Sequence, residues 1–492
     1  MSLSQRISRG LKATLLSRIV RSVANAAMII VLARYLLGPD GYGLLYFALS
    51  VIGVIAIFAS AGLPKSTARY VNTYLEDDPS QIPLILRQSA TYILVLSGIV
   101  GVGLFIGNDW LATILNEPAL APFLLVGIAY VLFRAFNQYC ILAFQGFNRV
   151  DWSAVMGIIE SVARLVCVIT LVVLGYGVIG AFTGYILGYV ASVAFGVVGL
   201  YVFFYSQFDG APQLEPGLSR RILEYSIPLT ATRGANVLDK RVDTVLVGVL
   251  LSATAVSFYT IARQVAEFAA IPVRSLGFTI SPALGEQKFA DEPDVAARIY
   301  EESFRHVSML YIPGVVGLVL VADPLIRYVV GAEYLGAVPV LQVLSLFVLV
   351  NAINLITTDS LDYLGRARIR AIAKGVTAIA NFFLNLLLLP LIGVVGAALA
   401  TVITFTMYTA INVYVIHREL GLDFVSLGRS AVVVTGISLV MGTVVLLSLP
   451  YVSGLLTLAV TIAAGVAIWA ILSVAVGLID PDEAVAFLAE RN

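Results

Sequence analysis

Charged residues are scarce in this chain of 492 residues: only 12% are Asp, Glu, Lys or Arg, whereas 60% are apolar. A globular protein is nearer a quarter charged. A chain of this size could not hide so much apolar surface in one core, so the composition excludes a water-soluble protein of any fold. The chain must therefore use lipid as its solvent.

Cysteine and histidine are almost absent. Cys140 and Cys167 both lie in long apolar runs, and two cysteines cannot build a disulfide framework or a Cys-rich metal site. The two histidines, His306 and His417, lack the spacing of a zinc enzyme. We therefore expect no metal site and no cofactor.

Neither nucleic acid nor a nucleotide is an expected ligand. The 30 basic residues are balanced by 30 acidic ones, which leaves no basic footprint for nucleic acid. The segment from Gly62 to Thr67 resembles the end of a phosphate-binding loop, but Ala59 and Pro64 stand where such a loop needs glycine. We therefore expect no nucleotide-driven motor.

Long apolar runs dominate the sequence. A membrane-spanning helix needs about 20 predominantly apolar residues. Fourteen such runs lie roughly at 14–37, 43–63, 88–107, 120–142, 154–175, 178–204, 228–251, 256–280, 304–322, 338–357, 372–390, 394–416, 431–449 and 455–478. Within the sixth run, Gly180, Gly184 and Gly188 predict close helix packing. The sequence thus predicts an all-α integral membrane protein with about 14 transmembrane helices.

Basic residues fall mostly on one side of the predicted membrane. Most of the 30 lie in loops on the side of the N-terminus, whereas the opposite side holds Arg34 and Arg327. By the positive-inside rule, both termini are then cytoplasmic. We expect the longer loops at 64–87, 205–227 and 281–303 to face the cytoplasm of a multi-pass protein in the cell membrane.

The two halves of the chain match at an offset of about 216 residues. Tyr176–Ala181 (YGVIGA) resembles Ile392–Ala397 (IGVVGA), and shorter matches elsewhere keep the same order. Because six spans is an even number, both units enter the membrane in the same sense, which is the parallel-repeat plan of some transporters. We predict six-helix lobes at 1–210 and 211–420, then two additional helices and a short cytoplasmic tail at 421–492.

Thirteen charged residues stand inside the predicted spans. At roughly 2.5 to 3.5 kcal/mol each on the insertion scale, exposing all of them to lipid would cost on the order of 30 to 45 kcal/mol. A fold is only about 5 to 15 kcal/mol stable. Most must therefore face protein or a water-filled cavity. They are Arg18, Arg21, Arg134, Glu160, Arg164, Arg233, Asp239, Lys240, Arg241, Asp243, Arg263, Glu267 and Arg274.

Three spans carry a polar stripe when drawn at 100° per residue. We expect the stripes to form one interior surface that binds substrate, with Asp243 and Glu267 as coupling or gating acids. Arg241 alone points away from its stripe. The stripes are Arg18, Arg21 and Asn25 in the first span, Arg233, Asn236, Asp239, Lys240 and Asp243 in the seventh, and Arg263, Glu267 and Arg274 in the eighth.

Structural alternatives exist for each group of charges. Arg18 and Arg21 lie near the cytoplasmic end of their span and could be interfacial anchors. Glu160 and Arg164 are four residues apart, the spacing of an ion pair within one helix. The bases and acids of the seventh and eighth spans could also form a pairing network that locks these two helices together.

Several stretches are similar to one known family, the polysaccharide or oligosaccharide (Wzx-like) flippases, whose superfamily also holds multidrug exporters and the peptidoglycan lipid flippase. The resemblance implies two six-helix lobes around a central cavity lined by helices 1, 2, 7 and 8, with alternating access. Many relatives follow the acid of helix 7 with a base, whereas Thr244 follows Asp243 here. The matching stretches are Ala33–Leu49, Gly62–Val71, Phe144–Trp152, Val242–Ala262 and Val330–Leu344.

We predict a transporter, not an enzyme, that flips a polyprenyl phosphate- or pyrophosphate-linked oligosaccharide across the cytoplasmic membrane for surface polysaccharide or glycoprotein glycan assembly. The excess of bases over acids in the spans fits an anionic head group, and the planar guanidinium of Arg holds phosphate oxygens in pairs. Expected partners are the polyprenyl-linked glycan, membrane lipids, and glycosyltransferases or a polymerase of the same pathway.

Two other functions remain open from the sequence. A cation-coupled multidrug exporter of the same fold would rely on a membrane carboxylate such as Asp243 or Glu267. A membrane polysaccharide polymerase or glycosyltransferase would need a large outer loop, whereas the outer loops predicted near 108–119 and 323–337 are short.

The predicted orientation can be tested with one cysteine. In a variant without Cys140 and Cys167, we expect Asn116→Cys to react with a membrane-impermeant maleimide added outside intact cells, because residues 109–119 form a predicted outer loop. Labelling of Asn116→Cys only from the cytoplasm would reverse the orientation.

Overall fold

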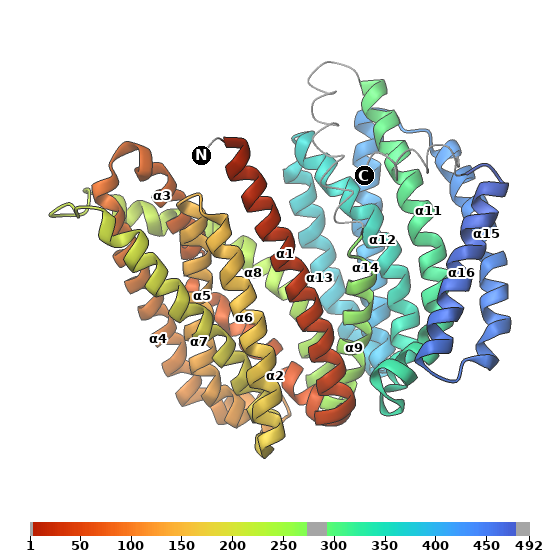
Figure 1. The fold of residues 1–492 in the computed structure, drawn as a ribbon, viewed down its shortest axis with the longest axis horizontal. Coiled ribbons are helices and arrows are strands. Elements are labelled where there is room, and N and C mark those ends of the chain that lie inside the picture. The colour runs from red at the N-terminus through yellow and green to blue at the C-terminus, as the bar shows by residue number, and fades with distance from the viewer. Residues whose placement is uncertain (1–2, 273–292, 479–492) are drawn as a thin grey trace. The chain divides into compact units, whose positions relative to one another are not determined.

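The computed structural model describes residues 3–272 and 293–478, and within these ranges the regular structure is entirely helical (Figure 1). The chain forms two compact units, the first ending at Ser257 and the second beginning at Phe258. The all-α fold class is confirmed. The lobe boundaries expected at 210/211 and 420/421 stay a prediction.

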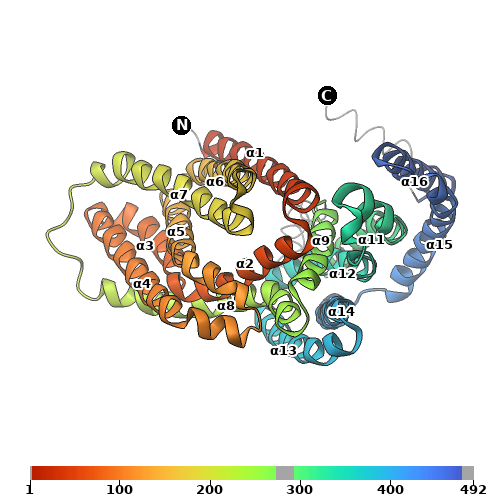
Figure 2. The ribbon, with the colours of Figure 1, turned by 90° about the horizontal axis from the view of Figure 1, so that it is seen from below.

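The first unit contains eight helices and the start of a ninth in the described residues. Helix α1 packs on α6, α4 on α5, and both α5 and α6 on α7 (Figure 2). Helix α8 packs on α2 and α3. The helices are α1 Leu3–Ile30, which continues as a π-helical turn Val31–Leu37, α2 Gly38–Ser60, α3 Leu63–Asp77, α4 Ile82–Ile114, α5 Ala121–Gly146, α6 Val150–Leu171, α7 Gly177–Phe203 and α8 Leu218–Leu250.

The second unit repeats this order of packing. Helix α11 packs on α12, and both α12 and α13 pack on α14. The last two helices, α15 and α16, pack on each other and on α11 (Figure 2). The helices are α9 Ala253–Ala269, which begins in the first unit, α11 Pro293–Leu325, α12 Ala337–Tyr363, α13 Ala367–Ile392, α14 Val394–Leu420, α15 Phe424–Ser448 and α16 Leu455–Ala475. The shared order supports the parallel repeat, which stays a prediction.

Ten segments of the described chain are long and apolar enough to cross a membrane, so this is a multi-pass membrane protein. Two of them, Thr14–Ser60 and Val150–Gln207, each include two helices. Helix α8 is too charged to count among the ten and α9 has 17 residues, yet each of the fourteen predicted runs overlaps a helix. The number of crossings, fourteen, stays a prediction.

Close packing of α6 on α7 depends on the predicted glycine stripe. A Cβ atom on Gly184 would lie 2.6 Å from the backbone nitrogen of Val168, and one on Gly188 would lie 2.9 Å from the carbonyl oxygen of Glu160. Such contacts require small residues, because they bring two helix backbones together. The packing role predicted for the stripe is confirmed.

This contact gives a stability prediction. We expect Gly184→Val to lower the free energy of unfolding by about 1 to 3 kcal/mol, because the new side chain would overlap the α6 backbone. Gly103→Val on α4 is the control, since a Cβ atom there meets nothing within 4 Å. Equal thermal unfolding midpoints for the two purified variants would contradict the prediction.

Candidate functional site

Arg233 joins three helices in the first unit. It projects from α8, and its Nη1 donates to Ser60 Oγ at the end of α2 at 2.7 Å. Its Nη2 donates to Gln138 Oε1 on α5. Both acceptors are neutral, so these bonds hold the guanidinium without cancelling its charge. Sequence reasoning identified Arg233 but neither of these partners.

Two further arginines approach the backbone of α2. Arg134 Nη1 on α5 donates to the carbonyl oxygen of Gly53 at 3.3 Å, and Arg241 Nη1 on α8 donates to that of Leu49. A Cβ atom on Gly53 would lie 2.6 Å from the Arg241 Cζ, so the glycine makes room for the guanidinium.

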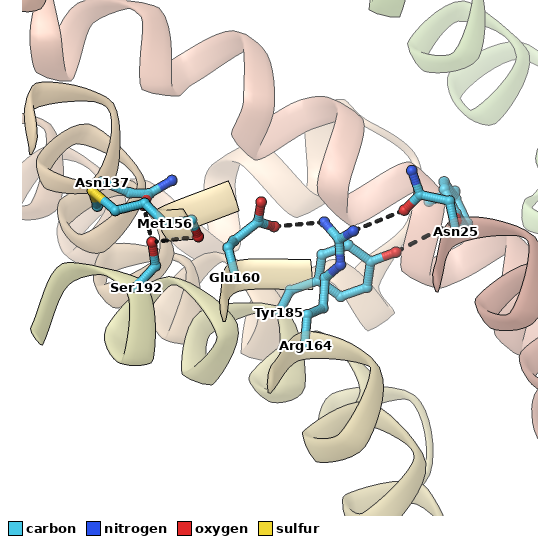
Figure 3. A network of polar contacts seen from close by, with 8 residues as sticks. Asn25, Asn137, Met156, Glu160, Arg164, Tyr185 and Ser192 are labelled. Carbon is cyan, nitrogen blue, oxygen red and sulfur yellow. Dashed lines mark hydrogen bonds and ion pairs between the residues drawn. The ribbon is translucent and has the colours of Figure 1, made fainter. Parts of the chain in front are cut away.

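A second polar group joins α1 to α6 (Figure 3). Arg164 Nη1 pairs with Glu160 Oε1 at 2.8 Å, and its Nη2 donates to Asn25 Oδ1 on α1 at 2.8 Å. The ring of Tyr185 on α7 lies 5.2 Å from the guanidinium. The Glu160–Arg164 pair is the alternative interpretation from the sequence and is confirmed, and its link to Asn25 is new.

The predicted stripe of α1 is divided between two surroundings. Arg21 donates from Nε and Nη2 to Ser17 Oγ at 3.2 and 3.1 Å, and its guanidinium lies against Gly157 of α6. Asn25 also contacts α6 through Arg164, and all three residues, Arg18, Arg21 and Asn25, are exposed. Arg21 and Asn25 therefore contact α6 while remaining exposed, and their place on the substrate surface stays a prediction.

The remaining predicted residues of α8 differ in exposure. Asn236, Asp239 and Lys240 are exposed, whereas Asp243 is only 2% exposed. The helical wheel placed all four on one face with Arg233. Because burial depends on neighbouring helices, the wheel could not separate Asp243 from the rest of the stripe.

In the second unit, Arg263 and Glu267 are joined. Arg263 Nε donates to Glu267 Oε1 at 3.2 Å across one turn of α9. Arg274 lies outside the described residues. A single central surface shared by the stripes of α1, α8 and α9 stays a prediction.

Sequence reasoning did not detect a contact between the start of α2 and the start of α9. Thr254 Oγ1 at the start of α9 donates to Asp40 Oδ1 at the start of α2. Gly43 approaches the carbonyl group of Ala253 so closely that no side chain would fit. The glycine-rich stretch Gly-Pro-Asp-Gly-Tyr-Gly at 38–43 was the sequence feature that could have indicated this close contact.

The second unit also contains an apolar cavity of about 400 Å³. Its walls come from the end of α9 and from α11, α12, α15 and α16, and they include Tyr311, Leu318, Met441, Ile462 and Trp469. Such walls suit hydrocarbon rather than a charged group. Among the described residues, no three His, Cys, Asp or Glu side chains gather as metal ligands.

These features define a multi-pass helical membrane protein with charged side chains held between its helices. Residues 7–286 match the family described as "Polysaccharide biosynthesis protein", and residues 228–387 match the MatE family. The first match covers more than half of the chain. The chain therefore belongs to the polysaccharide biosynthesis protein family.

Relatives in one archaeon and one bacterium have names that refer to flippases or to polysaccharide biosynthesis. The chain is 22% identical over 397 residues to "Probable low-salt glycan biosynthesis flippase Agl15" of Haloferax volcanii, covering 79% of each chain. It is 30% identical over 310 residues to "Probable flippase AglR" of the same organism, covering 59% of this chain and 62% of the relative. It is 23% identical to "Lipopolysaccharide biosynthesis protein WzxC" of Escherichia coli, covering 83% and 78%.

Solved structures show the same fold. The inward closed conformation of the lipid II flippase MurJ matches with a TM-score of 0.75 and 16% identity, covering 94% of this chain and 97% of that one. The inward-facing conformation of a multidrug resistance MATE transporter matches with a TM-score of 0.64 and 16% identity, covering 83% and 96%. These matches show that the chain has the fold shared by MurJ and the MATE transporters.

The Glu160–Arg164 pair gives a stability prediction. Each side chain is only 13% exposed. Because Glu160→Gln leaves the arginine without its counter-ion, we expect it to cost about 3 to 5 kcal/mol of stability, and Glu160→Gln with Arg164→Gln to cost less. Thermal unfolding in detergent would measure both.

An exposed pair of the same spacing provides the control. Arg220 and Glu224 on α8 are 84% and 56% exposed, so Glu224→Gln should cost at most about 1 kcal/mol. If the single and double variants at 160 and 164 were equally stable, the ion pair would not have its inferred role.

Proposed function

We propose that this protein moves a lipid-linked oligosaccharide across the cell membrane by alternating access. The head group's phosphate or pyrophosphate contacts arginines, while the polyprenyl tail stays in lipid. The observation that carries the proposal is Arg233, whose described acceptors, Ser60 and Gln138, are neutral. Its charge therefore remains available to an anion, and a guanidinium binds phosphate oxygens in pairs.

The relatives support the choice of substrate. Agl15 and AglR are named as flippases, the first of them for a glycan, and WzxC is named for lipopolysaccharide biosynthesis. We infer transport rather than catalysis, with both termini in the cytoplasm. Glycosyltransferases or a polymerase would supply or use the glycan on either side of the membrane.

The proposed binding site consists of residues from the three stripes. We assign substrate contacts to Arg18, Arg21, Asn25, Arg233, Asn236, Lys240, Arg263 and Arg274, and coupling or gating to Asp243 and Glu267. The pair of Arg263 with Glu267 supports this division, because an incoming phosphate could take the place of the carboxylate. Exchanging one partner for another avoids leaving the arginine buried without a counter-ion.

A coupling role requires a difference between the two access states. A ligand that binds both states equally shifts neither population. We therefore propose that Asp243 and Glu267 pair with bases more strongly in one state than in the other. The buried position of Asp243 supports this proposal, because an ion pair is stronger away from water.

A second candidate function is a cation-coupled multidrug exporter. The MatE match over residues 228–387 and the similarity to a multidrug transporter structure favour it. Such an exporter would carry cationic compounds and would depend on Asp243 or Glu267. The polysaccharide family match covers more of the chain and is the stronger support.

The test is flipping of a fluorescent polyprenyl pyrophosphate oligosaccharide in vesicles with purified protein. We expect Arg233→Gln to slow flipping at least about tenfold, since hydrogen bonds to charged groups contribute about 1.5 to 3 kcal/mol. Arg220→Gln, which changes an exposed arginine of the same helix, should keep the wild-type rate.

The coupling acids form a further arm of this test. Asp243→Asn should reduce flipping more than it reduces the amount of protein in the membrane. Wild-type rates in both Asp243→Asn and Glu267→Gln would end the coupling proposal. Drug efflux by vesicles that flip no lipid-linked sugar would favour the exporter instead.

A further inference from the structure

The linker between α7 and α8, residues 204–217, is bonded to the segment that follows α3. The backbone N–H of Ala211 donates to the carbonyl oxygen of Ser80 at 2.9 Å. Gln81 is buried and uses both ends of its amide: Nε2 donates to the carbonyl oxygen of Gln213 at 3.3 Å, and Oε1 accepts from the N–H of Glu215 at 3.0 Å. The linker therefore runs alongside this segment and is hydrogen-bonded to it.

Glu215 at the end of the linker ties α3 to α8. Its carboxylate accepts from the Tyr74 hydroxyl of α3 and from Nη2 of Arg221 on α8. The same Nη2 donates to the Tyr74 hydroxyl oxygen at 3.3 Å. The Tyr74 hydrogen bond, followed by that from Arg221, lowers the pKa of Glu215, so the carboxylate is ionised at neutral pH.

Successive turns of α8 continue this contact. Ser219 bonds to the Tyr92 hydroxyl of α4, and the carbonyl oxygen of Ile222 accepts from Ser66 Oγ of α3 at 2.9 Å. On the next turn, the Tyr225 ring lies under a guanidinium of α3, with Arg69 Cζ 4.2 Å from the ring centroid. Every turn of α8 from its start to Tyr225 is thus fixed to α3 or α4.

The backbones of α3 and α8 also meet directly. Gly62 caps the start of α3 with φ of +72°, a conformation that favours glycine. A Cβ atom at this position would lie 2.5 Å from the carbonyl oxygen of Ser226. No side chain therefore fits between the two backbones at Gly62, and this close approach fixes the register of α8 on α3.

The number of bonds decides whether this contact opens during transport. Moving a two-state equilibrium from 1:99 to 99:1 changes its equilibrium constant by a factor of about 10⁴. One hydrogen bond changes such an equilibrium constant roughly fivefold. Eight hydrogen bonds join the linker and α8 to α3, α4 and residues 80–81, and together they exceed that factor.

We propose that α3, the linker at 208–217 and α8 up to Tyr225 remain joined throughout the transport cycle, which makes the linker a strap and not a hinge. In this role Glu215, Tyr74 and Gln81 are positioning residues. Through the register of α8, they hold Arg233 opposite Ser60 and Gln138, two turns farther along the same helix.

Hydrogen exchange tests the strap without any assay of transport. The amides of Ala211 and Glu215 should exchange slowly in the purified wild-type protein, because both are hydrogen-bonded. We expect Gln81→Ala to speed their exchange at least about tenfold, since it removes the Glu215 acceptor. Arg220→Gln, the exposed neighbour of Arg221, should leave exchange unchanged. Exchange in the wild type at the rate of an open loop would overturn the proposal.

Reversible cross-linking tests whether the strap opens, and this arm rests on the proposed function. Cysteines replace Tyr74 and Glu215 in a variant with Cys140→Ala and Cys167→Ala, and a flexible disulfide-containing bis-maleimide joins them. We expect the cross-linked protein to flip the lipid-linked sugar at no less than about half the rate of the reduced protein.

The two arms separate failure of the strap from failure of the flippase. If cross-linking stops flipping and reduction restores it, the strap must open in each cycle and the proposal is wrong. If the reduced protein flips no lipid-linked sugar at all, the proposed function fails, and the strap is then judged by the exchange of the Ala211 and Glu215 amides alone.

Discussion

The cost of placing a charge in hydrocarbon is the constraint on which this structure depends. The first unit meets it at three arginines by giving each of them protein partners. Arg233 donates to two neutral side chains, and Arg134 and Arg241 donate to backbone carbonyl groups of α2. A helix carbonyl has a second lone pair, so it can accept such a bond without breaking the helix. Charge is thereby buried but not cancelled, as an anion-binding surface requires.

Much of the fold could be predicted from the sequence, because lipid imposes strict rules on composition and length. All fourteen apolar runs overlap helices, and the spacing of Gly184 and Gly188 anticipated the close packing of α6 on α7. The Glu160–Arg164 pair also followed from spacing, since residues four apart lie on one helix face. These features depend only on periodicity within a single helix.

Features that depend on a second helix could not be predicted in this way. A helical wheel gives the direction of a side chain but not the helix that it meets. Arg21 and Asn25 were expected on the substrate surface, which stays a prediction, and the wheel gave no sign that both also contact α6. The strap shows the same limit. Gln81 and Glu215 are polar residues in loops, and only their tertiary contacts set them apart from solvated side chains.

The predicted internal repeat pairs residues of the two units that lie about 217 positions apart. Asn137 and Ser192 form a buried bond between α5 and α7, and 217 residues farther along, Asn354 lies on α12 and bonds to Asn412 of α14. At the same offset, the positions of Arg134, Glu160 and Arg164 hold Asn351, Thr377 and Asn381. Asn381 bonds to the neutral hydroxyl of Thr404. At these three positions the first unit thus holds charged side chains and the second unit neutral ones. At this offset the arginines of α5 and α6 have no charged counterpart in the second unit, whereas the proposed substrate contacts include Arg233 on α8 and Arg263 on α9.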